Sequence, residues 1–295
     1  MKTENLEALL LTIEKGSISA AAEMLNYTPS AVSREIRSLE KELGMPLLTR
    51  SKAGVSVTQA GALLLPEIRR LVRDAYMLRE NALQIEEGIS GTVRLGVCYP
   101  ALYPWVSTVM AEYRAQYPGM RYIVKNGFSS ALMEQVRQQE IDFCLISRVD
   151  DTCGWIPLLE DELVAILPPD HPFADRERVP ITLLAEGPYL ELHSNMGTET
   201  DNSRALRAAG IQPRNVLPVD DSSALYPMVE AGLGIGMENR INTLGREGNF
   251  VIRQIDPPQI VPLGIAFRED MIPAARRFVE YLAEAKETLH KAVRL

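Results

Sequence analysis

The sequence predicts two kinds of architecture in one chain, an all-α region before residue 60 and an α/β region after residue 90. In the first region, two short segments with one apolar face each are joined by a polar turn within residues 18–43. In the second, short apolar runs alternate with helical patterns from Thr92 onwards, as repeated βα units do. A long segment of helical periodicity, residues 59–87, lies between them.

Residues 18–40, ISAAAEMLNYTPSAVSREIRSLE, predict two amphipathic helices that meet at a tight turn. Ala21 and Ala22 are small enough for the helices to approach closely, and Asn26 tolerates the left-handed conformation of a sharp turn. Thr28 is a favourable N-cap, and Pro29 at the first helical position loses no hydrogen bond. This arrangement is typical of a helix-turn-helix, whose second helix enters the DNA major groove. The alternative is an ordinary helical hairpin with a solvated polar face.

The second helix is expected to run from Pro29 to Leu43, with one apolar stripe formed by Val32, Ile36, Leu39 and Leu43. Its outward face then carries hydroxyls and guanidiniums, which pair with phosphate or with base edges. The candidate DNA-binding residues of this helix are Ser30, Ser33, Arg34 and Arg37. We favour the first three, because contacts usually come from the first turns of such a helix.

Two short β-like runs, residues 47–50 and 55–57, follow the second helix and predict a β-hairpin wing. Arg50 and Lys52 lie at its tip, where they are expected near the DNA backbone. The alternative is two surface cations on a turn.

A long helix is predicted from the N-cap Thr58 to Glu87, followed by a hinge at residues 88–91. Pro66 is expected to kink or loosen its first turns. Apolar residues recur at alternating steps of four and three, which is typical of a two-chain seam, although packing against the chain's own core is the alternative. The predicted dimerisation residues are Leu64, Ile68, Leu71, Ala75, Leu78, Ala82 and Ile85.

The region after residue 91 predicts strands and helices in alternation, and its near-continuous apolar runs suggest buried parallel strands. Strands are expected at residues 92–98, 121–125, 142–147, 163–167, 189–192, 216–219, 233–237 and 263–267. Helices are expected at residues 104–117, 130–139, 200–209, 223–231 and 274–293.

The first 65 residues resemble the N-terminal domain of LysR-type transcriptional regulators. The resemblance rests on several pieces in order, namely residues 6–13, 16–22, Leu25, 31–33, Ile36, 39–40, 43–44, Leu47, Arg50 and 58–61. Pro29-Ser30 stands where the family usually has Gln-Pro, so the family's base contacts cannot be transferred to that position. Leu48 replaces the usual phenylalanine.

The second region also resembles this family, through Glu162–Pro168, His171–Ala174 and Ala231–Gly236. The resemblance implies a bilobed, periplasmic-binding-protein-like effector domain. The expected domains are a winged helix-turn-helix at 1–58, a linker helix and hinge at 59–90, and an effector domain at 91–295. Its lobe I would comprise 91–161 and 268–295, and its lobe II 162–267.

Ligands of open α/β sheets bind beyond the carboxyl ends of strands, several of which here precede helix N-termini that favour anions. The predicted effector-binding residues are Tyr99, Pro100, Ala101, Phe128, Ser129, Ser147, Arg148, Ser194, Asn195 and Asp220. Arg148 would attract a carboxylate, whereas Asp220 and Glu238 would repel one. Each hydroxyl has the alternative role of an N-cap, so the ligand's chemistry stays open.

The composition fits a DNA-binding, ligand-sensing protein once the charge is divided along the chain. The net charge is −8, but residues 1–90 hold 11 Lys/Arg and 12 Asp/Glu, whereas residues 91–295 hold 20 and 27. The weak basic patch near the second helix favours two copies on DNA. Cys98, Cys144 and Cys153 form no CxxC spacing and are expected as reduced core thiols of a cytoplasmic protein; a redox-sensing pair is the alternative.

No metal-ligand spacing, cofactor motif, catalytic signature, signal peptide or membrane span is visible. We therefore expect a non-enzyme that binds double-stranded DNA and a small-molecule effector, without a cofactor, a metal or membrane contact. The resemblance implies a homodimer that assembles into a homotetramer, with RNA polymerase as a candidate partner. The rival is a solute-binding or enzymatic α/β module with a dimerisation domain that does not bind DNA, which leaves residues 17–58 unexplained.

Overall fold

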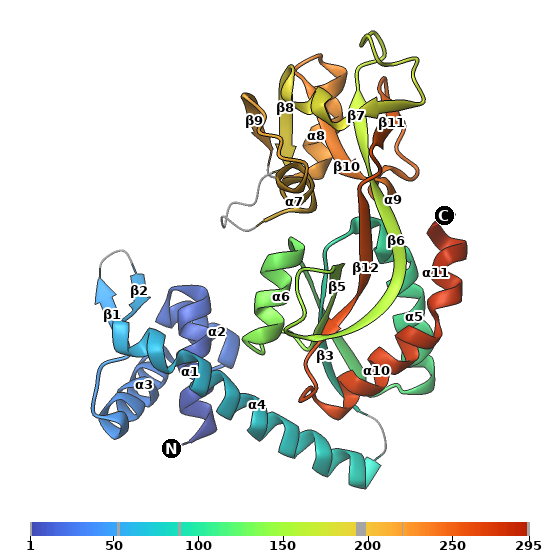
Figure 1. Ribbon diagram of the computed structural model, residues 1–295. Coiled ribbons are helices and arrows are strands. Elements are labelled where there is room, and N and C mark those ends of the chain that lie inside the picture. Colours follow the sequence, from blue (N-terminus) through green and yellow to red (C-terminus); the bar gives the residue numbers. More distant parts are fainter. Residues whose placement is uncertain (1, 52–53, 88–89, 193–198, 220, 294–295) are drawn as a thin grey trace. The chain divides into compact units, whose positions relative to one another are not determined.

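The computed structural model describes residues 2–51, 54–87, 90–192, 199–219 and 221–293. The chain divides into two compact units near residues 88–89, one helical with a small β-hairpin and one α/β (Figure 1). The predicted fold class is therefore confirmed. Four of the predicted site residues lie outside the described residues: Lys52, Ser194, Asn195 and Asp220. The side chain of Ile85 is likewise not described.

Three helices begin the N-terminal unit, and each of them ends where a residue adopts the left-handed conformation. They are α1 (Thr3–Lys15), α2 (Ile18–Leu25) and α3 (Pro29–Leu43). Gly16, Asn26 and Gly44 have φ of 62°, 55° and 74°, as helix C-caps commonly do. The Thr28 side chain accepts a hydrogen bond from the Ala31 N–H at 3.2 Å, so the predicted N-cap of α3 is confirmed.

The wing is an antiparallel hairpin of β1 (Leu48–Ser51) and β2 (Gly54–Val57). Its start is fixed by Glu40 of α3, whose carboxylate accepts hydrogen bonds from the Leu47 and Leu48 N–H groups at 2.8 and 3.1 Å. Gly61, in the following helix, packs so closely that an added Cβ would lie 2.4 Å from the Leu47 carbonyl oxygen. Glycine is therefore required at this position.

The long helix α4 (Gln59–Glu87) begins at the predicted N-cap, since Thr58 Oγ1 accepts a hydrogen bond from the Gly61 N–H at 2.9 Å. Pro66 lies within this helix without ending it. Ile68 is buried in the core of the N-terminal unit, and Leu64 packs against that core. The first two residues of the predicted seam therefore contact the unit's own core, which was the alternative interpretation of this helix.

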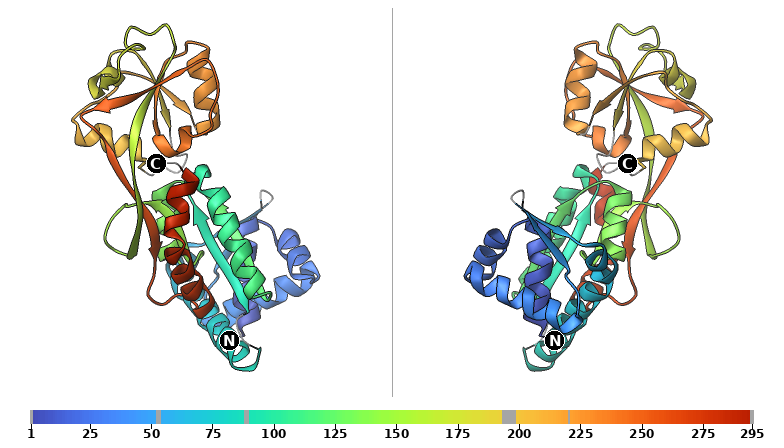
Figure 2. Two further views of the ribbon diagram at one scale, coloured as in Figure 1. Left: turned by 90° about the vertical axis from the view of Figure 1, so that its right-hand side faces the viewer. Right: turned by 90° about the vertical axis from the view of Figure 1, so that its left-hand side faces the viewer.

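Two lobes form the C-terminal unit, and the long strand β6 runs through both parts of its mixed sheet (Figures 1 and 2). The strand order is β4-β3-β5-β12-β6-β10-β8-β9, with β11 paired to β6 and β7. The strands of the first lobe are β3 (Gly91–Val97), β4 (Met120–Asn126), β5 (Phe143–Ser147), β6 (Gly154–Leu167) in its first half, and β12 (Ile260–Phe267). Those of the second are the rest of β6, β7 (Arg178–Pro180), β8 (Pro188–Leu192), β9 (Asn215–Val219), β10 (Ile235–Asn239) and β11 (Val251–Asp256).

The lobe boundaries differ from those expected in one respect. The first crossing agrees with the sequence, because β6 pairs with β12 up to Glu162 and with β10 from Leu163 onwards. The return crossing precedes Ile260, since β12 pairs with β5 and with the first half of β6. Residues 260–267 thus belong to the sheet of lobe I.

Helices cover the sheet of each lobe. In lobe I they are α5 (Tyr103–Gln116), α6 (Ser129–Arg137), α10 (Pro273–Glu284) and α11 (Lys286–Val293), and in lobe II α7 (Asp201–Ala208), α8 (Ser222–Glu230) and α9 (Arg240–Thr243). The single C-terminal helix expected over 274–293 is broken at Ala285. The sequence reading also missed β7, β11, α9 and the first half of β6.

Candidate functional site

The exposed face of α3 and the wing together form one candidate surface. Ser30, Arg34, Arg37 and Arg50 are exposed, and Ser33 is half-buried. The Arg50 guanidinium donates a hydrogen bond to Ser33 Oγ at 2.8 Å, which links the wing to the second turn of α3. Five of the six predicted DNA-binding residues therefore share one surface, and the sixth, Lys52, is outside the described residues.

The N-terminus of α3 adds polar groups to this surface. Ser30 Oγ lies 3.0 Å from Thr28 Oγ1, so the cap and the first-turn hydroxyl form one polar cluster. Unpaired N–H groups at a helix N-terminus carry partial positive charge and favour phosphate oxygens. The face can thus bind an anionic backbone while its serines and arginines reach base edges.

A second candidate site is a cavity of about 430 Å³ in the C-terminal unit, within the usual size range of small-molecule sites. It lies where the ends of β3, β8 and β10 meet the first turns of α6, α7 and α8. Its lining residues are Cys98, Tyr99, Pro100, Asn126, Gly127, Phe128, Ser129, Leu192, Thr200, Asp201, Asn202, Asp221, Ser222, Glu238, Asn239 and Asn242.

Four predicted effector-binding residues line this pocket: Tyr99, Pro100, Phe128 and Ser129. Ser147 lies one step behind it, hydrogen-bonded through its N–H to Ser129 Oγ at 3.1 Å. Ala101, in the 3₁₀ turn Pro100–Leu102, is not among the lining residues.

Arg148 also lies outside the pocket lining. Its guanidinium donates to the Asp151 carboxylate at 2.6 Å and lies 5.9 Å from the centre of the Trp155 ring. The side chain is 48 % exposed. The described pocket therefore lacks the cation that the sequence placed there, because Arg148 is held by a neighbouring acid three residues along the chain.

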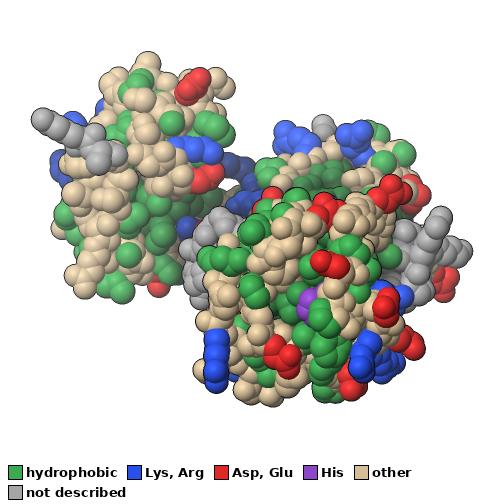
Figure 3. All heavy atoms as spheres, turned by 90° about the horizontal axis from the view of Figure 1, so that it is seen from above, with side chains coloured by type: hydrophobic (Ala, Val, Ile, Leu, Met, Phe, Trp, Pro, Cys, Tyr) green, Lys and Arg blue, Asp and Glu red, His purple; other side chains and the backbone are tan. Residues whose placement is uncertain are grey.

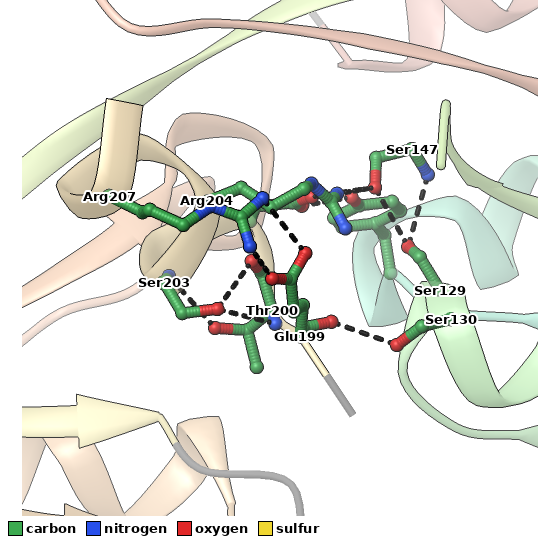
Figure 4. Close-up of polar contacts among 10 residues, drawn as sticks. Ser129, Ser130, Ser147, Glu199, Thr200, Ser203, Arg204 and Arg207 are labelled. Atoms are coloured by element: carbon green, nitrogen blue, oxygen red, sulfur yellow. Dashed lines mark hydrogen bonds and ion pairs between the residues drawn. The ribbon is translucent and has the colours of Figure 1, made fainter. Parts of the chain in front are cut away.

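The N-terminus of α7 connects the two lobes through a polar network (Figure 4). Asp201 accepts hydrogen bonds from the Tyr99 hydroxyl and from Ser147 Oγ, the second at 2.6 Å. Arg204 pairs with Asp201 and donates to Ser147 Oγ at 2.7 Å. Ser130 Oγ of α6 donates to the Glu199 carbonyl oxygen at 2.8 Å. A ligand entering here would meet side chains whose bonds already span both lobes.

Glu238 of β10 also lines the pocket and is 2 % exposed. Its carboxylate accepts hydrogen bonds from the Ser222 hydroxyl, from the Asn239 N–H at 2.9 Å and from Asn242 Nδ2 at 3.1 Å. Burial is the main cause that raises its pKa above the ordinary value. Asp221 is exposed and caps α8, accepting from the Ser223 N–H at 2.7 Å.

Known family models match both parts of the chain. The family model described as "Bacterial regulatory helix-turn-helix protein, lysR family" matches residues 3–62, and "LysR substrate binding domain" matches residues 86–287. The chain belongs to the LysR family. It is accordingly a transcriptional regulator with a helix-turn-helix DNA-binding domain and an effector-binding domain, as the sequence predicted.

Relatives of this LysR-family chain match over most of its length. An uncharacterized HTH-type transcriptional regulator YybE of Bacillus subtilis is 26 % identical over 96 % of this chain and 98 % of its own. A probable hydrogen peroxide-inducible genes activator of Mycobacterium leprae is 30 % identical over 78 % and 75 %.

Solved structures show the same fold. A full-length OxyR variant from Pseudomonas aeruginosa has a TM-score of 0.73 and 21 % identity, covering 100 % of this chain and 95 % of that one. The structure of full-length CbnR complexed with its target DNA has a TM-score of 0.65 and 18 % identity, covering 97 % of this chain and 100 % of that one.

The three cysteines of this LysR-family chain share one region of lobe I, where Cys98 and Cys153 pack against a core cluster that contains Cys144. Burial raises the pKa of Cys98 to about 12, and it also raises the pKa values of Cys144 and Cys153. All three cysteines are free. Their thiols are therefore protonated at neutral pH, which makes them poor nucleophiles.

The sequence reading of this LysR-family pocket missed the contributions of α7 and α9. Thr200, Asp201 and Asn202 open a helix directly after the segment that follows β8, which is the same signal used for the other strand ends. Asn239 and Asn242 carried no such signal, because α9 is a single short turn.

Among the described residues, no group of three or more His, Cys, Asp or Glu is arranged for a metal ion. The described helices also include none with the length and apolar character of a membrane span.

Proposed function

We propose that the pocket between α6, α7 and α8 is the effector site of this regulator, and that occupancy changes its binding to DNA. The observation that carries the proposal is the polar network of Asp201, which joins Tyr99 and Ser147 of lobe I to Arg204 of lobe II. A ligand beside this network would favour one arrangement of the lobes, and linkage would transmit that preference to the DNA-bound state.

We further propose that Ser30, Ser33, Arg34, Arg37, Arg50 and Lys52 contact DNA, with the first three nearest the bases. A dimer joined through α4 would present two such surfaces to half-sites one helical turn apart, roughly 34 Å, or a multiple of this. Leu71 and Leu78 support this role, because they are 43 % and 72 % exposed and lie seven residues apart. Tetramers, contact with RNA polymerase, a cytoplasmic location and the absence of enzymatic activity belong to the same proposal.

A peroxide-sensing role, as the names of several relatives state for those proteins, is not favoured. Peroxide oxidises the thiolate form of cysteine, and the three thiols of this chain have raised pKa values. A bound effector therefore explains the pocket better than cysteine oxidation does.

The DNA part is tested by fluorescence anisotropy with labelled DNA from upstream of the protein's own gene. A fragment with two half-sites should bind about 100-fold more tightly than a fragment with one, because the second contact is intramolecular. Equal affinity for both fragments would contradict binding as a dimer to two half-sites.

The effector part is tested by thermal shift against a metabolite library, since a ligand at 100 times its Kd stabilises the folded protein by about 2.7 kcal/mol.

A further inference from the structure

The pocket has a one-sided charge. Its described lining includes three carboxylates, Asp201, Asp221 and Glu238, but contains no Lys, Arg or His. Elsewhere on this unit the two signs are interspersed, as the face in Figure 3 shows. Arg204, which is not among the lining residues, pairs with Asp201. The printed contacts of the other two acids, Asp221 and Glu238, are with neutral donors among the described residues. An anionic ligand would meet this excess of like charge.

Two of the helix N-termini at the pocket, those of α7 and α8, already carry the chain's own acids, whereas that of α6 does not. Asp221 caps α8, and Asp201 lies in the first turn of α7. The Ser222 hydroxyl, at the start of α8, donates to Glu238. Carboxylates in these places offset the positive end of the helix dipole. Their presence makes an anion less favourable at the N-termini of α7 and α8.

Acceptors on β10 and α9 are available to a ligand, beside one buried donor, Asn239 Nδ2. Among the described residues, Glu238 accepts hydrogen bonds from neutral donors, namely Ser222, the Asn239 N–H and Asn242. The Asn242 amide N–H donates a hydrogen bond to Glu238, and Asn242 Oδ1 is buried without a hydrogen-bond partner among the described residues. Buried carboxylates and carbonyl oxygens are stabilised by donors and by positive charge. An ammonium group supplies both.

The lining also includes the apolar side chains of Pro100, Phe128 and Leu192. The cavity of about 430 Å³ accommodates a small organic molecule. From the charge, the acids at the N-termini of α7 and α8 and the free acceptors, we infer that this pocket selects a small organic amine, with its ammonium at Glu238 and Asp221, over a carboxylate of the same skeleton. The inference rests on the proposal that the pocket is the effector site.

The test compares matched amines and acids on the full chain by thermal shift and isothermal titration calorimetry. Phenethylamine is compared with 3-phenylpropionate, and 1,4-diaminobutane with succinate. At least one of the amines should raise the unfolding midpoint of the C-terminal unit, whereas neither acid should. A shift with an acid but with no amine, or no shift with either amine, would overturn the inference.

Two variants locate the binding. Glu238→Gln should weaken the amine by about tenfold or more. Because Glu238 is buried, Asp221→Asn serves as a second variant that keeps an N-cap residue while removing the charge. Glu160→Gln, at an exposed position on β6 outside the lining, is the matched control and should change nothing. Amine binding that is equal in all three variants would overturn the inference.

The same data separate this inference from the proposed function. If an acid binds and Phe128→Ala abolishes its shift, the pocket remains the effector site and only the preferred charge is wrong. If a probe binds but its thermal shift is the same in the pocket variants as in the wild type, the probe binds elsewhere. Both the amine inference and the assignment of the pocket as the effector site are then overturned. DNA affinity, measured separately by anisotropy, reports on the helix-turn-helix in either case.

Discussion

The DNA-facing surface and the pocket are built in opposite ways. The first comes from one short stretch of chain, α3 and the adjoining wing, and its polar groups are mostly exposed cations and hydroxyls. The second is assembled from segments between Cys98 and Asn242, and its charges are carboxylates. A local motif can therefore be identified from sequence residue by residue, whereas a pocket assembled from distant segments is identified only as a region.

The largest expected effect concerns the packing that supports the DNA-facing surface. Gly61→Ala places a Cβ 2.4 Å from the Leu47 carbonyl oxygen. We expect the N-terminal unit to lose about 3 kcal/mol of unfolding free energy, while the midpoint of the C-terminal unit stays unchanged. Denaturant unfolding of the full chain measures both transitions. Gly187→Ala is the control, because nothing lies within 4 Å of its added Cβ.

The next effect concerns the second copy of the DNA-facing surface. Leu78 is 72 % exposed on α4, and Leu78→Asp should place a charge in the proposed seam without disturbing the core. We expect a monomer in light scattering and a loss of DNA affinity of about 100-fold. Leu63→Asp is the control, since Leu63 is 73 % exposed on the same helix but outside the predicted heptad positions. A stable Leu78→Asp dimer would show that α4 does not form the seam.

A smaller effect tests the acidity near the pocket. Asp161 is 3 % exposed and accepts a hydrogen bond from the Ile241 N–H at 3.2 Å. Burial raises its pKa to about 6. Since the folded pKa exceeds the unfolded value of about 3.9, the contribution of this group to stability is fully present below pH 4 and is lost as the pH rises through 6.

Asp161→Asn removes that titration. We expect the variant to gain about 2 kcal/mol over the wild type at pH 7, and this gain to vanish near pH 4. Urea unfolding at the two pH values measures the difference. Glu160→Gln, at the exposed neighbouring position, should show no such dependence. If the stability of Asp161→Asn changed with pH in the same way as that of the wild type, Asp161 would not have a raised pKa.

The last prediction is that oxidation of the cysteines has no effect on DNA binding. Hydrogen peroxide at micromolar concentration should leave DNA affinity unchanged, because burial raises the pKa of Cys98 to about 12 and keeps the thiol protonated. Anisotropy before and after treatment checks this. A change that Cys98→Ser abolishes would mean that this region senses oxidation.

The contrast between the two sites explains how far the sequence could lead. Thr28, Pro29 and Asn26 act locally, through a cap, a first-turn proline and a left-handed turn, so the bounds of α3 could be predicted. Glu40 could not be recognised as the acceptor for Leu47 and Leu48, because that role depends on how the wing folds back onto α3.

The pocket shows the limit of the same reasoning. The rule that ligands bind beyond strand ends found Tyr99 and Ser129, but it also selected Arg148, which pairs with Asp151 instead. Periodicity gave no sign of β11 or α9, whose pairing and position are set by distant parts of lobe II. The side chains that Asn239 and Asn242 contribute could not be found before the lobes were assembled.

If the exposed face of α3 binds DNA, the affinity for DNA should depend steeply on salt and should fall when Arg34 is removed. Anisotropy titrations of the wild type, Arg34→Ala and Arg214→Ala should be compared over a range of salt concentrations. We expect a steep slope of about −0.9 per phosphate neutralised for the wild type, and about tenfold weaker binding with reduced sequence preference for Arg34→Ala. Arg214→Ala, an exposed arginine of the C-terminal unit, should behave as the wild type. Unchanged affinity and sequence preference in Arg34→Ala would contradict the assignment of α3 as the recognition helix.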